Sequence, residues 1–552
     1  MDEPERALFR AHPWVRTAVV RDAGHAVLAK GGRAIIQACR HLLKDFATPS
    51  GVQAAPSRNE PAERALVRRI PLTARRVLYV GDASAAVEAE LRSGHACVDL
   101  QAVPVGSLPA KAAAFDCVAV SDLRPGDVPG LAALLQDGGD LVAALSAMAP
   151  EAVTALRTEL AQAGLRAMAV HDPKLDHLLN DARGDLLAVF EANVVSQPVV
   201  LAARKTPRPP QRMLVQLAAY APFGMDIRTR LPLEGMRSRP DVAVALCGAP
   251  AMLLPAPAHR PKVLILQRPT RTGFELWRRE LADAVRRDWI TVMEFDDHPD
   301  LMARMGGGQT DWRLFSFTHA VQTSTPPLEE AFRPWNPEVK VFENAVFDLG
   351  PFADRRPPHR IFYGGLRRGP FAMQVAASMR RVAEAFPQVQ FVVVGDRAIF
   401  DALPGGRNEF HDLLPYERYL EVMSSCSISL SPIEDAPLLA TKSDGKFLDA
   451  SSRGLLTIAS PTVYDRTIRH GETGLIAERL EDWAELTIEA LRDESARDRI
   501  ARAAWSYVRE QRMFAHQLPD RIEWYRSLWE RRAELTAGLV ARVPRLGAEL
   551  SV

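Results

Sequence analysis

TKSDGKFLDASSRGLLTIASPTVYDRTIRHGETG, residues Thr441 to Gly474, holds the most informative pattern in the chain. It begins with a cationic turn that contains Lys442 and Lys446, continues with a short predicted helix that carries Asp449, and then enters the apolar run 455–459. Open α/β sheets hold anionic ligands at their carboxyl edge, where a polar loop opens a helix. The stretch therefore predicts a ligand site beside a buried parallel strand.

Short apolar runs also alternate with helical stretches on both sides of this segment, which predicts an α/β protein with parallel, doubly wound sheets. A chain of 552 residues, at roughly 100–200 residues per domain, is expected to contain three such domains. We predict a helical N-terminal segment with a linker, an N-terminal Rossmann-like domain, a middle domain, a C-terminal domain and C-terminal helices. These divisions cover residues 1–70, 71–205, 210–345, 346–515 and 516–552.

The quoted segment resembles the donor-sugar half of the retaining GT-B-type glycosyltransferases of family 4. The family pattern is an acidic residue, seven others, a Glu, then Ala and a glycine turn into a strand. Residues 449–455 (DASSRGL) match its second half with Asp in place of Glu, and Thr441 stands where the first acid is expected. The surrounding lysines resemble a lysine-bearing variant found in sugar-polymer enzymes. The resemblance implies two Rossmann-like domains in a GT-B arrangement over residues 210–552.

Donor-binding roles follow from the same resemblance. It implies that Asp449 contacts the nucleotide ribose, that two basic clusters neutralise the diphosphate, and that the loop after the strand 389–394 reads the nucleobase. Charge on the leaving diphosphate dominates the barrier to sugar transfer, so cations are needed there. The predicted donor-binding residues are Gly365, Arg367, Arg368, Asp396, Lys442, Ser443, Lys446 and Asp449.

A second polar cluster, 294–300 (EFDDHPD), follows a predicted strand of the middle domain. In a GT-B protein it would face the interdomain cleft, where Asp296, Asp297 and His298 are candidate catalytic residues that position the acceptor hydroxyl and accept its proton. Two other interpretations remain. Glu294 and Asp296 have the form of a GT-A metal motif, and the cluster could also be an Asp-rich turn with a helix cap. We expect no metal.

The N-terminal domain resembles a class I methyltransferase. We predict strands at 75–82 and 95–100, with Asp99 at the end of the second strand to meet ribose hydroxyls, and a closing hairpin from 185–191 and 198–203. Only Gly81 follows the first strand, whereas cofactor-binding loops need several glycines. We therefore expect a domain without catalytic function, and S-adenosylmethionine is not expected as a cofactor.

Composition limits the partners. With 69 basic and 68 acidic residues, the net charge of +1 gives no reason to expect nucleic acid or a strongly anionic membrane as a partner. The scattered cysteines, the absence of a signal peptide and the absence of a long apolar run predict a cytoplasmic protein, with peripheral attachment to the inner face of the cell membrane left open. No G-x-S-x-G, P-loop or H-E-x-x-H motif is present.

The sequence therefore predicts an enzyme that moves a sugar from a nucleotide-diphosphate sugar to a hydroxyl of a glycan, lipid-linked or protein acceptor, with retention, in bacterial surface polysaccharide or glycoconjugate synthesis. A glycosyltransferase-like binding or scaffold protein is an alternative, favoured by Thr441. A bifunctional methyltransferase and glycosyltransferase is the other.

Overall fold

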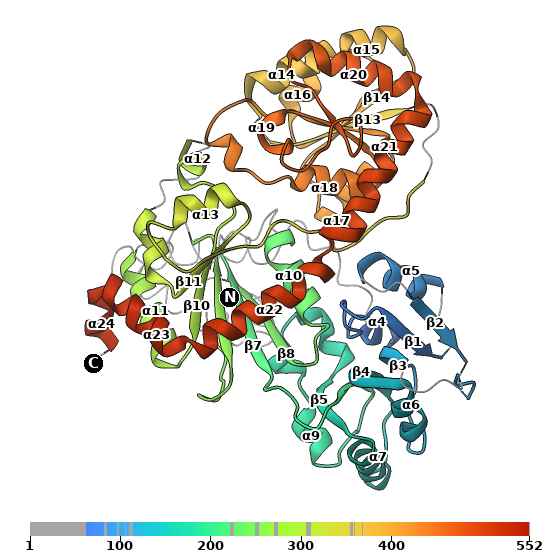
Figure 1. Ribbon diagram of the computed structural model, residues 1–552, viewed down its shortest axis with the longest axis vertical. Helices are drawn as coiled ribbons and strands as arrows, with labels where there is room; N and C mark the ends of the chain where they lie inside the picture. Colours follow the sequence, from blue (N-terminus) through green and yellow to red (C-terminus); the bar gives the residue numbers. More distant parts are fainter. Residues whose placement is uncertain are drawn as a thin grey trace, which may run out of the picture. The chain divides into compact units, whose positions relative to one another are not determined.

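Three six-stranded sheets follow one another along the chain in the computed structural model (Figure 1). They confirm the predicted α/β class with several Rossmann-like domains. Residues 1–61 of the predicted helical N-terminal segment and linker lie outside the residues that the structure describes. Those residues are 62–81, 85–95, 99–104, 106–109, 114–220, 226–248, 253–269, 274–304, 311–353, 357, 359–366 and 368–550.

The C-terminal sheet is fully parallel, with the strand order β15-β14-β13-β16-β17-β18. The chain runs outward from β13 to one edge and then returns to build the other, so the strand order reverses between β13 and β16. Ligands of open α/β sheets bind outside the carboxyl ends of the strands at such a reversal. The strands are β13 (Arg360–Gly364), β14 (Gln390–Val394), β15 (Glu409–His411), β16 (Ile428–Ser431), β17 (Leu456–Ala459) and β18 (Leu475–Ile476).

Apolar faces of the surrounding helices cover this sheet, and Trp483 and Met379 are fully buried against it. The helices are α14 (Gly369–Ser378), α15 (Arg380–Ala385), α16 (Arg397–Ala402), α17 (Tyr416–Ser424), the 3-10 turn η4 (Leu439–Thr441), α18 (Gly445–Ser452), α19 (Pro461–Tyr464), α20 (Leu480–Arg492) and α21 (Glu494–Tyr507). The α18–β17 unit is the segment quoted from the sequence.

The middle sheet is also parallel, with the order β12-β11-β10-β9-β7-β8. Its strands are β7 (Met213–Ala219), β8 (Val242–Gly248), β9 (Lys262–Gln267), β10 (Ile290–Glu294), β11 (Ala320–Thr323) and β12 (Val339–Val341). Its helices and 3-10 turns are η2 (Asp226–Arg228), α10 (Arg230–Met236), α11 (Phe274–Arg286), α12 (Pro299–Arg304), η3 (Trp312–Phe317) and α13 (Pro326–Phe332).

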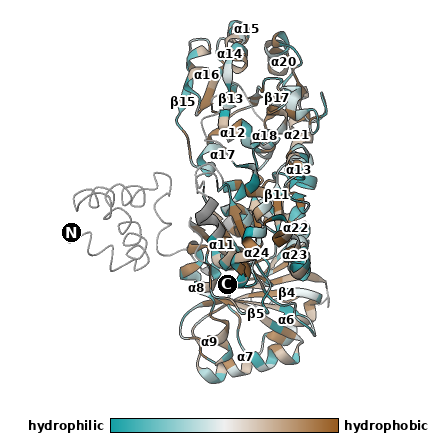
Figure 2. Cartoon of the chain, turned by 90° about the vertical axis from the view of Figure 1, so that its left-hand side faces the viewer, coloured by the Kyte–Doolittle hydropathy of each residue, from teal (hydrophilic) through white to brown (hydrophobic). Residues whose placement is uncertain are grey.

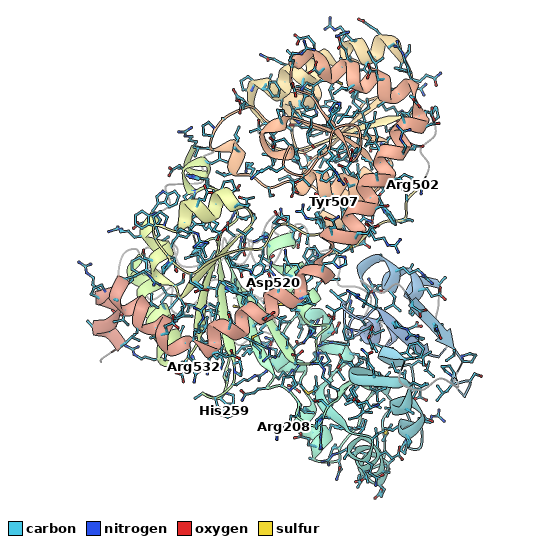
Figure 3. All side chains as sticks on the ribbon, viewed as in Figure 1. Arg208, His259, Arg502, Tyr507, Asp520 and Arg532 are labelled. Atoms are coloured by element: carbon cyan, nitrogen blue, oxygen red, sulfur yellow. The ribbon has the colours of Figure 1, made fainter. Side chains whose placement is uncertain are left out.

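The tail folds back over the middle sheet. A π-helical turn, η5 (Val508–Arg512), leads into α22 (Phe514–Glu530), α23 (Arg532–Arg542) and α24 (Pro544–Leu550). Tyr525 and Leu528 of α22 belong to the core that contains β7, β9 and β10, and Asp520 on its outer side accepts a hydrogen bond from Lys340 at 3.2 Å (Figure 3). The tail therefore braces the middle domain.

The N-terminal sheet has the order β2-β1-β3-β4-β6-β5, in which β6 is antiparallel to both of its neighbours. Its strands are β1 (Arg76–Val80), β2 (Asp99–Val103), β3 (Phe115–Val120), β4 (Leu135–Leu145), β5 (Leu165–His171) and β6 (Val199–Lys205). The other elements are α4 (Ala62–Val67), α5 (Ala85–Gly94), α6 (Val128–Leu134), α7 (Pro150–Gln162), η1 (Pro173–Leu178), α8 (Asp181–Gly184) and α9 (Leu187–Glu191). In Figure 2, α7 carries both hydrophobic and hydrophilic residues, as expected for a helix that buries Val153, Leu156 and Leu160.

Two sequence predictions are wrong in this domain. Residues 187–191 form α9, and β6 pairs instead with β5 in the closing hairpin, because a short apolar run does not distinguish a strand from a helix. Asp99 begins β2 and stands beside Arg76 at the amino end of the sheet. It therefore lies at the edge opposite to the one where a cofactor ribose would bind.

Candidate functional site

Lys446 and Arg368 lie at the carboxyl edge of the C-terminal sheet, at the reversal between β13 and β16. Lys446 projects from the first turn of α18, and its ammonium donates a hydrogen bond to the carbonyl of Gly364 at the end of β13. Burial, together with the charge of Arg368, lowers the pKa of Lys446 to about 7, although the charge of Asp449 opposes the shift. The ammonium is thus a cation that a nearby anion would stabilise strongly.

Arg368 packs over Gly365, whose missing side chain leaves room for it: a Cβ there would meet the guanidinium Nε at 3.3 Å. Within the described part of the chain, the Arg368 side chain makes no hydrogen bond or ion pair, and its neighbour Arg367 lies outside that part. The backbone N–H of Arg368 instead donates to Asp396 at 3.4 Å. The guanidinium is therefore a half-buried charge without an acidic hydrogen-bond partner among the described residues.

Asp396 serves as a helix cap. Its Oδ1 accepts the N–H of Ile399 at 3.4 Å at the start of α16, and its Oδ2 accepts the N–H of Arg368. It follows Gly395, whose φ of +92° places its backbone close to the carbonyl of Gly365. Asp396 thus ties together the loops that follow β13 and β14, a role that its position after a strand could also have indicated.

Asp449 lies one turn after Lys446 on α18. Its Oδ1 accepts a hydrogen bond of 2.7 Å from the hydroxyl of Tyr416, at the start of α17. Burial raises the pKa of Asp449 to about 6, although the Tyr416 hydroxyl and the charge of Lys446 favour its ionised form. Since Tyr416 occupies one oxygen, the other can accept hydrogen bonds from a ligand.

Lys442 and Ser443 contact the middle domain rather than this edge. The Lys442 ammonium donates to Asp297 at 2.8 Å, and the Ser443 hydroxyl accepts from the amide of Asn344 at 2.8 Å. The charge of Lys442 still depresses the pKa of Lys446, so the two ammonium groups lie near one another. The backbone carbonyl of Thr441 accepts a further hydrogen bond, from Thr325, at 2.8 Å.

The acidic loop after β10 is organised by one arginine. Arg268 follows β9 with a φ of +48°, and its guanidinium bonds Asp296 at 2.8 Å and also Asp297. Burial alone would raise the pKa of Asp297, but the charges of Lys442 and Arg268 outweigh it and hold that pKa below its usual value. Asp296 and Asp297 are therefore carboxylates in ion pairs, which weakens them as proton acceptors.

His298 is the remaining candidate in this loop. Its ring lies 5.2 Å from that of Trp312 in an edge-on arrangement, and its Nδ1 accepts the N–H of Asp300 at 3.2 Å. Burial lowers the pKa of His298. The imidazole is therefore neutral at physiological pH, with its proton on Nε2. Its Nδ1, once released from the Asp300 N–H, is the better proton acceptor of the loop.

Glu294 does not join Asp296 as a metal ligand. It is buried at the end of β10 and pairs with Arg228 at 2.8 Å, while Gln322 bonds its second oxygen. Among the described residues, no group of three or more His, Cys, Asp or Glu side chains could hold a metal ion. The geometry does not support the GT-A interpretation of this motif.

Three residues that hold the site were not among the predicted donor-binding or catalytic residues. Arg268, Asn344 and Tyr416 supply the partners of Asp297, Ser443 and Asp449. A polar residue directly after a buried strand or at a helix start was the available signal, because such positions gather at the carboxyl edge of parallel sheets. Which acid or hydroxyl each would meet could not be read from spacing.

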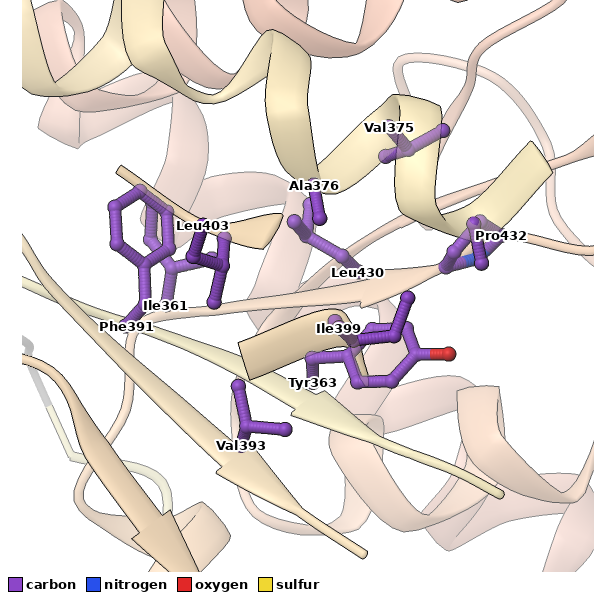
Figure 4. Close-up of a pocket in the computed structure, with 11 residues that line it drawn as sticks. Ile361, Tyr363, Val375, Ala376, Phe391, Val393, Ile399, Leu403, Leu430 and Pro432 are labelled. Carbon is purple, nitrogen blue, oxygen red and sulfur yellow. The ribbon is translucent and has the colours of Figure 1, made fainter. Parts of the chain in front are cut away.

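A small apolar cavity lies beneath this edge, between the C-terminal sheet and helices α14 and α16 (Figure 4). Leu430, Ile399 and Val393 line it with other aliphatic side chains, and Tyr363 is also in the wall. It contains none of the charged residues above. It is a packing defect of the core, distinct from the polar site.

The comparison with known protein families matches the part of the chain that contains the polar site. Residues 367–522 match the family model described as Glycosyl transferase-like. The matched segment begins at the loop of Arg368 and includes Lys446 and Asp449. The match confirms the predicted class of enzyme, a glycosyltransferase. No curated protein sequence matches the chain.

Several solved structures are similar in outline. HepE from Anabaena, solved with UDP-glucose, is 14% identical, with a TM-score of 0.38 over 57% of this chain and 100% of that one. Sucrose-phosphate synthase from Thermosynechococcus elongatus is 13% identical, with a TM-score of 0.41 over 58% and 100%. A glycosyltransferase from Rickettsia africae is 10% identical, with a TM-score of 0.41 over 57% and 98%. At these values we draw no functional conclusion from the likenesses.

Among the described residues, no helix is both long enough and apolar enough to cross a bilayer.

Proposed function

We propose that the protein transfers a sugar from a nucleoside-diphosphate sugar to a hydroxyl of a glycan, lipid-linked or protein acceptor, with retention at the anomeric carbon. The observation that carries the proposal is the pair Lys446 and Arg368 at the strand-order reversal of the C-terminal sheet. Neither cation has an acidic hydrogen-bond partner among the described residues. Two cations without an acidic hydrogen-bond partner at that edge suit a diphosphate.

Each residue then has a distinct role. Arg368 and Lys446 bind the diphosphate and stabilise the charge that develops on it as the bond to the sugar breaks. Asp449, oriented by the Tyr416 hydroxyl, accepts hydrogen bonds from the ribose. His298 accepts the proton of the acceptor hydroxyl, while the ion-paired Asp296 and Asp297 position that hydroxyl.

Ligand-dependent melting tests the donor site. A ligand that binds only the folded state raises the melting temperature, so a panel of nucleoside diphosphates and their sugars should give one clear shift. Arg368→Gln and Lys446→Met should abolish it, whereas Arg381→Gln, which removes an exposed ion pair between α15 and Glu485 of α20, should not. An unchanged shift in both site variants would refute the assigned roles.

A non-catalytic binding protein is the second candidate, and Thr441 favours it. Its hydroxyl donates to the carbonyl of Leu438 at 2.7 Å at the turn η4. Thr441 thus stands at the position of the family's first acid but offers no carboxylate to the donor sugar. Tight nucleotide binding without release of nucleoside diphosphate, over a panel of acceptors, would support this alternative. Formation of nucleoside diphosphate and glycosylated acceptor in equal amounts would exclude it.

A further inference from the structure

The chain crosses between the middle and C-terminal domains twice, and the two crossings are joined to each other. Val346 in the first crossing donates to the carbonyl of Arg512 at 2.8 Å, and its own carbonyl accepts the N–H of Phe514 at 2.8 Å. These bonds form a parallel bridge between Val346 and Met513. We call residues 344–349 and 512–514 the hinge, because any rotation of one domain against the other must pass through them.

The N-terminal domain contacts this hinge directly. The carbonyl of Ser93, in the last turn of α5, accepts the N–H of Leu349 at 2.8 Å. The last carbonyls of a helix have no partner within the helix and carry its negative dipole end, so they bind N–H groups readily. At the adjacent Gly94 the hinge is so close that a Cβ would lie 3.2 Å from the carbonyl oxygen of Phe347.

A second contact comes from Leu72, just before β1. Its side chain packs against both the core of the middle domain and the core that contains Val346 and Met513. Its N–H donates to the hydroxyl of Ser238 at 3.2 Å. The segment that enters the N-terminal sheet therefore touches both sides of the hinge.

The N-terminal domain is also fixed to the middle domain, so it cannot follow the hinge passively. Arg69 and Arg237 share the carboxylates of Asp176 and Asp181, with four nitrogen–oxygen distances between 2.7 and 3.2 Å. All four side chains are at most 7% exposed, and Asp181 also accepts the N–H of Val244 in β8 at 3.0 Å. A buried network of this kind holds one geometry, since breaking it leaves charges unpaired.

We propose that the N-terminal Rossmann-like domain is a hinge support that restrains opening and closure of the two transferase halves. Anchored to the middle domain, it holds the first crossing through the Ser93–Leu349 bond and the packing of Leu72. Closure around a donor then proceeds against this restraint. The inference rests on the proposed function only where it concerns donor-induced closure, because the restraint on the hinge is a property of the ligand-free protein.

Two glycines provide a matched test. Gly94→Ala places a methyl group 3.2 Å from the carbonyl oxygen of Phe347 in the hinge. Gly130→Ala, in α6 and away from the hinge, places a methyl group at the same distance of 3.2 Å from the flexible end of the Leu108 side chain. Both glycines are helical and neither has a positive φ. Hydrogen exchange of the full-length chain, followed by mass spectrometry, reports the amides of 346–350 without any ligand.

We expect exchange of the Leu349 amide to be at least about threefold faster in Gly94→Ala and unchanged in Gly130→Ala, because local opening sets that rate. Leu72→Ala should have the same effect, and it provides the test if Gly94→Ala does not fold as judged by circular dichroism. Unchanged exchange in both Gly94→Ala and Leu72→Ala, or equal acceleration in Gly130→Ala, would overturn the proposal.

A second arm adds UDP and the other nucleoside diphosphates one at a time. The one that binds should protect 346–350 in the wild-type chain and protect it less in Gly94→Ala. If none binds any variant, the proposed donor site fails while the ligand-free result on the hinge still stands. Equal protection in the wild type and in Gly94→Ala would contradict the role of the support in closure.

Discussion

Asp297 Oδ1 lies 2.8 Å from the ammonium of Lys442, and this bond joins the acidic loop of the middle domain to the loop that opens α18. The second oxygen of Asp297 is held by Arg268. In the ligand-free protein the charge of Lys442 is thus already neutralised by a carboxylate. A diphosphate that approached Lys446 would compete with Asp297 for Lys442.

Replacing Asp297 with Asn should therefore strengthen binding of the nucleoside diphosphate. A partly buried ion pair of this kind contributes about 1 kcal/mol, so freeing Lys442 should lower the dissociation constant by about fivefold. Lys442→Met should weaken binding instead. Isothermal titration calorimetry of the diphosphate, without acceptor, measures both.

The matched control is Asp311→Asn, which breaks an ion pair of 2.7 Å with Arg313 in the same domain. It removes the same charge from the protein but leaves Lys442 occupied, so affinity should not change. If Asp297→Asn and Asp311→Asn alter the affinity equally, the effect is one of net charge and the competition between Asp297 and the ligand is absent.

Diphosphate binding should also depend on pH near neutrality. Lys446, with a pKa of about 7, must be protonated to attract the ligand, and Asp449, with a pKa of about 6, must be ionised to accept ribose hydroxyls. Affinity should thus fall as pH rises through 7 and fall again as pH drops below 6. Binding at pH 7.5 should take up a proton, since the bound anion raises the pKa of Lys446.

Calorimetry in buffers of different ionisation enthalpy measures that proton uptake. Lys446→Arg provides the comparison, because a guanidinium stays charged throughout this range and the alkaline decline should disappear. A decline that persists in Lys446→Arg would assign the titration to another group.

The fold was largely predictable, because alternation of apolar runs and helices is a local property of the sequence. The segment 441–474 forms η4, α18 and β17 much as its pattern indicated. The failure at 187–191 has a physical reason: five residues of mixed apolar character satisfy either period, and packing of Phe190 into the core selects the helix.

The position of the site was predictable from the sequence, but the hydrogen-bond and ion-pair partners of its residues were not. Lys446 and Asp449 are one turn apart on α18, so their proximity follows from helix geometry. Lys442 is separated from Asp297 by 145 positions, and their pairing depends on how two domains meet. The Asp99 prediction failed because it placed this residue at the end of a strand. In the structure β2 begins at Asp99, so the residue lies at the opposite edge of the sheet.

The buried network that anchors the N-terminal domain should be important for stability. Asp181 is fully buried, and although burial opposes ionisation, the charges of Arg69 and Arg237 hold its pKa well below the usual range. Asp181→Asn leaves two buried arginines undercompensated and should cost about 3–5 kcal/mol of unfolding free energy. Urea denaturation followed by circular dichroism measures the loss.

Asp99→Asn is the contrasting variant. Asp99 faces Arg76 at 3.4 Å with both side chains nearly half exposed, and such pairs contribute at most about 1 kcal/mol. A loss at Asp181→Asn no larger than the one at Asp99→Asn would show that the network does not hold the domain.

His298 should limit turnover rather than donor binding. Its neutral imidazole is the best proton acceptor in the acidic loop, and general base catalysis typically contributes about 10²–10⁴-fold. His298→Gln should therefore lower kcat by at least about 100-fold while the dissociation constant of the nucleoside diphosphate stays constant. His470→Gln, at an exposed histidine of the C-terminal domain that accepts a backbone N–H from Ile476 at 3.0 Å, should leave both unchanged.

The pH profile of kcat distinguishes a general base from a residue with a structural role, because loss of a structural contact would not change the acid limb of the profile. Burial lowers the pKa of His298 below the ordinary 6.5, so the neutral base persists to lower pH and the acid limb of the profile should fall below 6.5. In His298→Gln that limb should vanish along with most of the rate. A variant that is slow but keeps the wild-type limb would show that His298 positions the acceptor through Trp312, and the proton would then have to leave by another route.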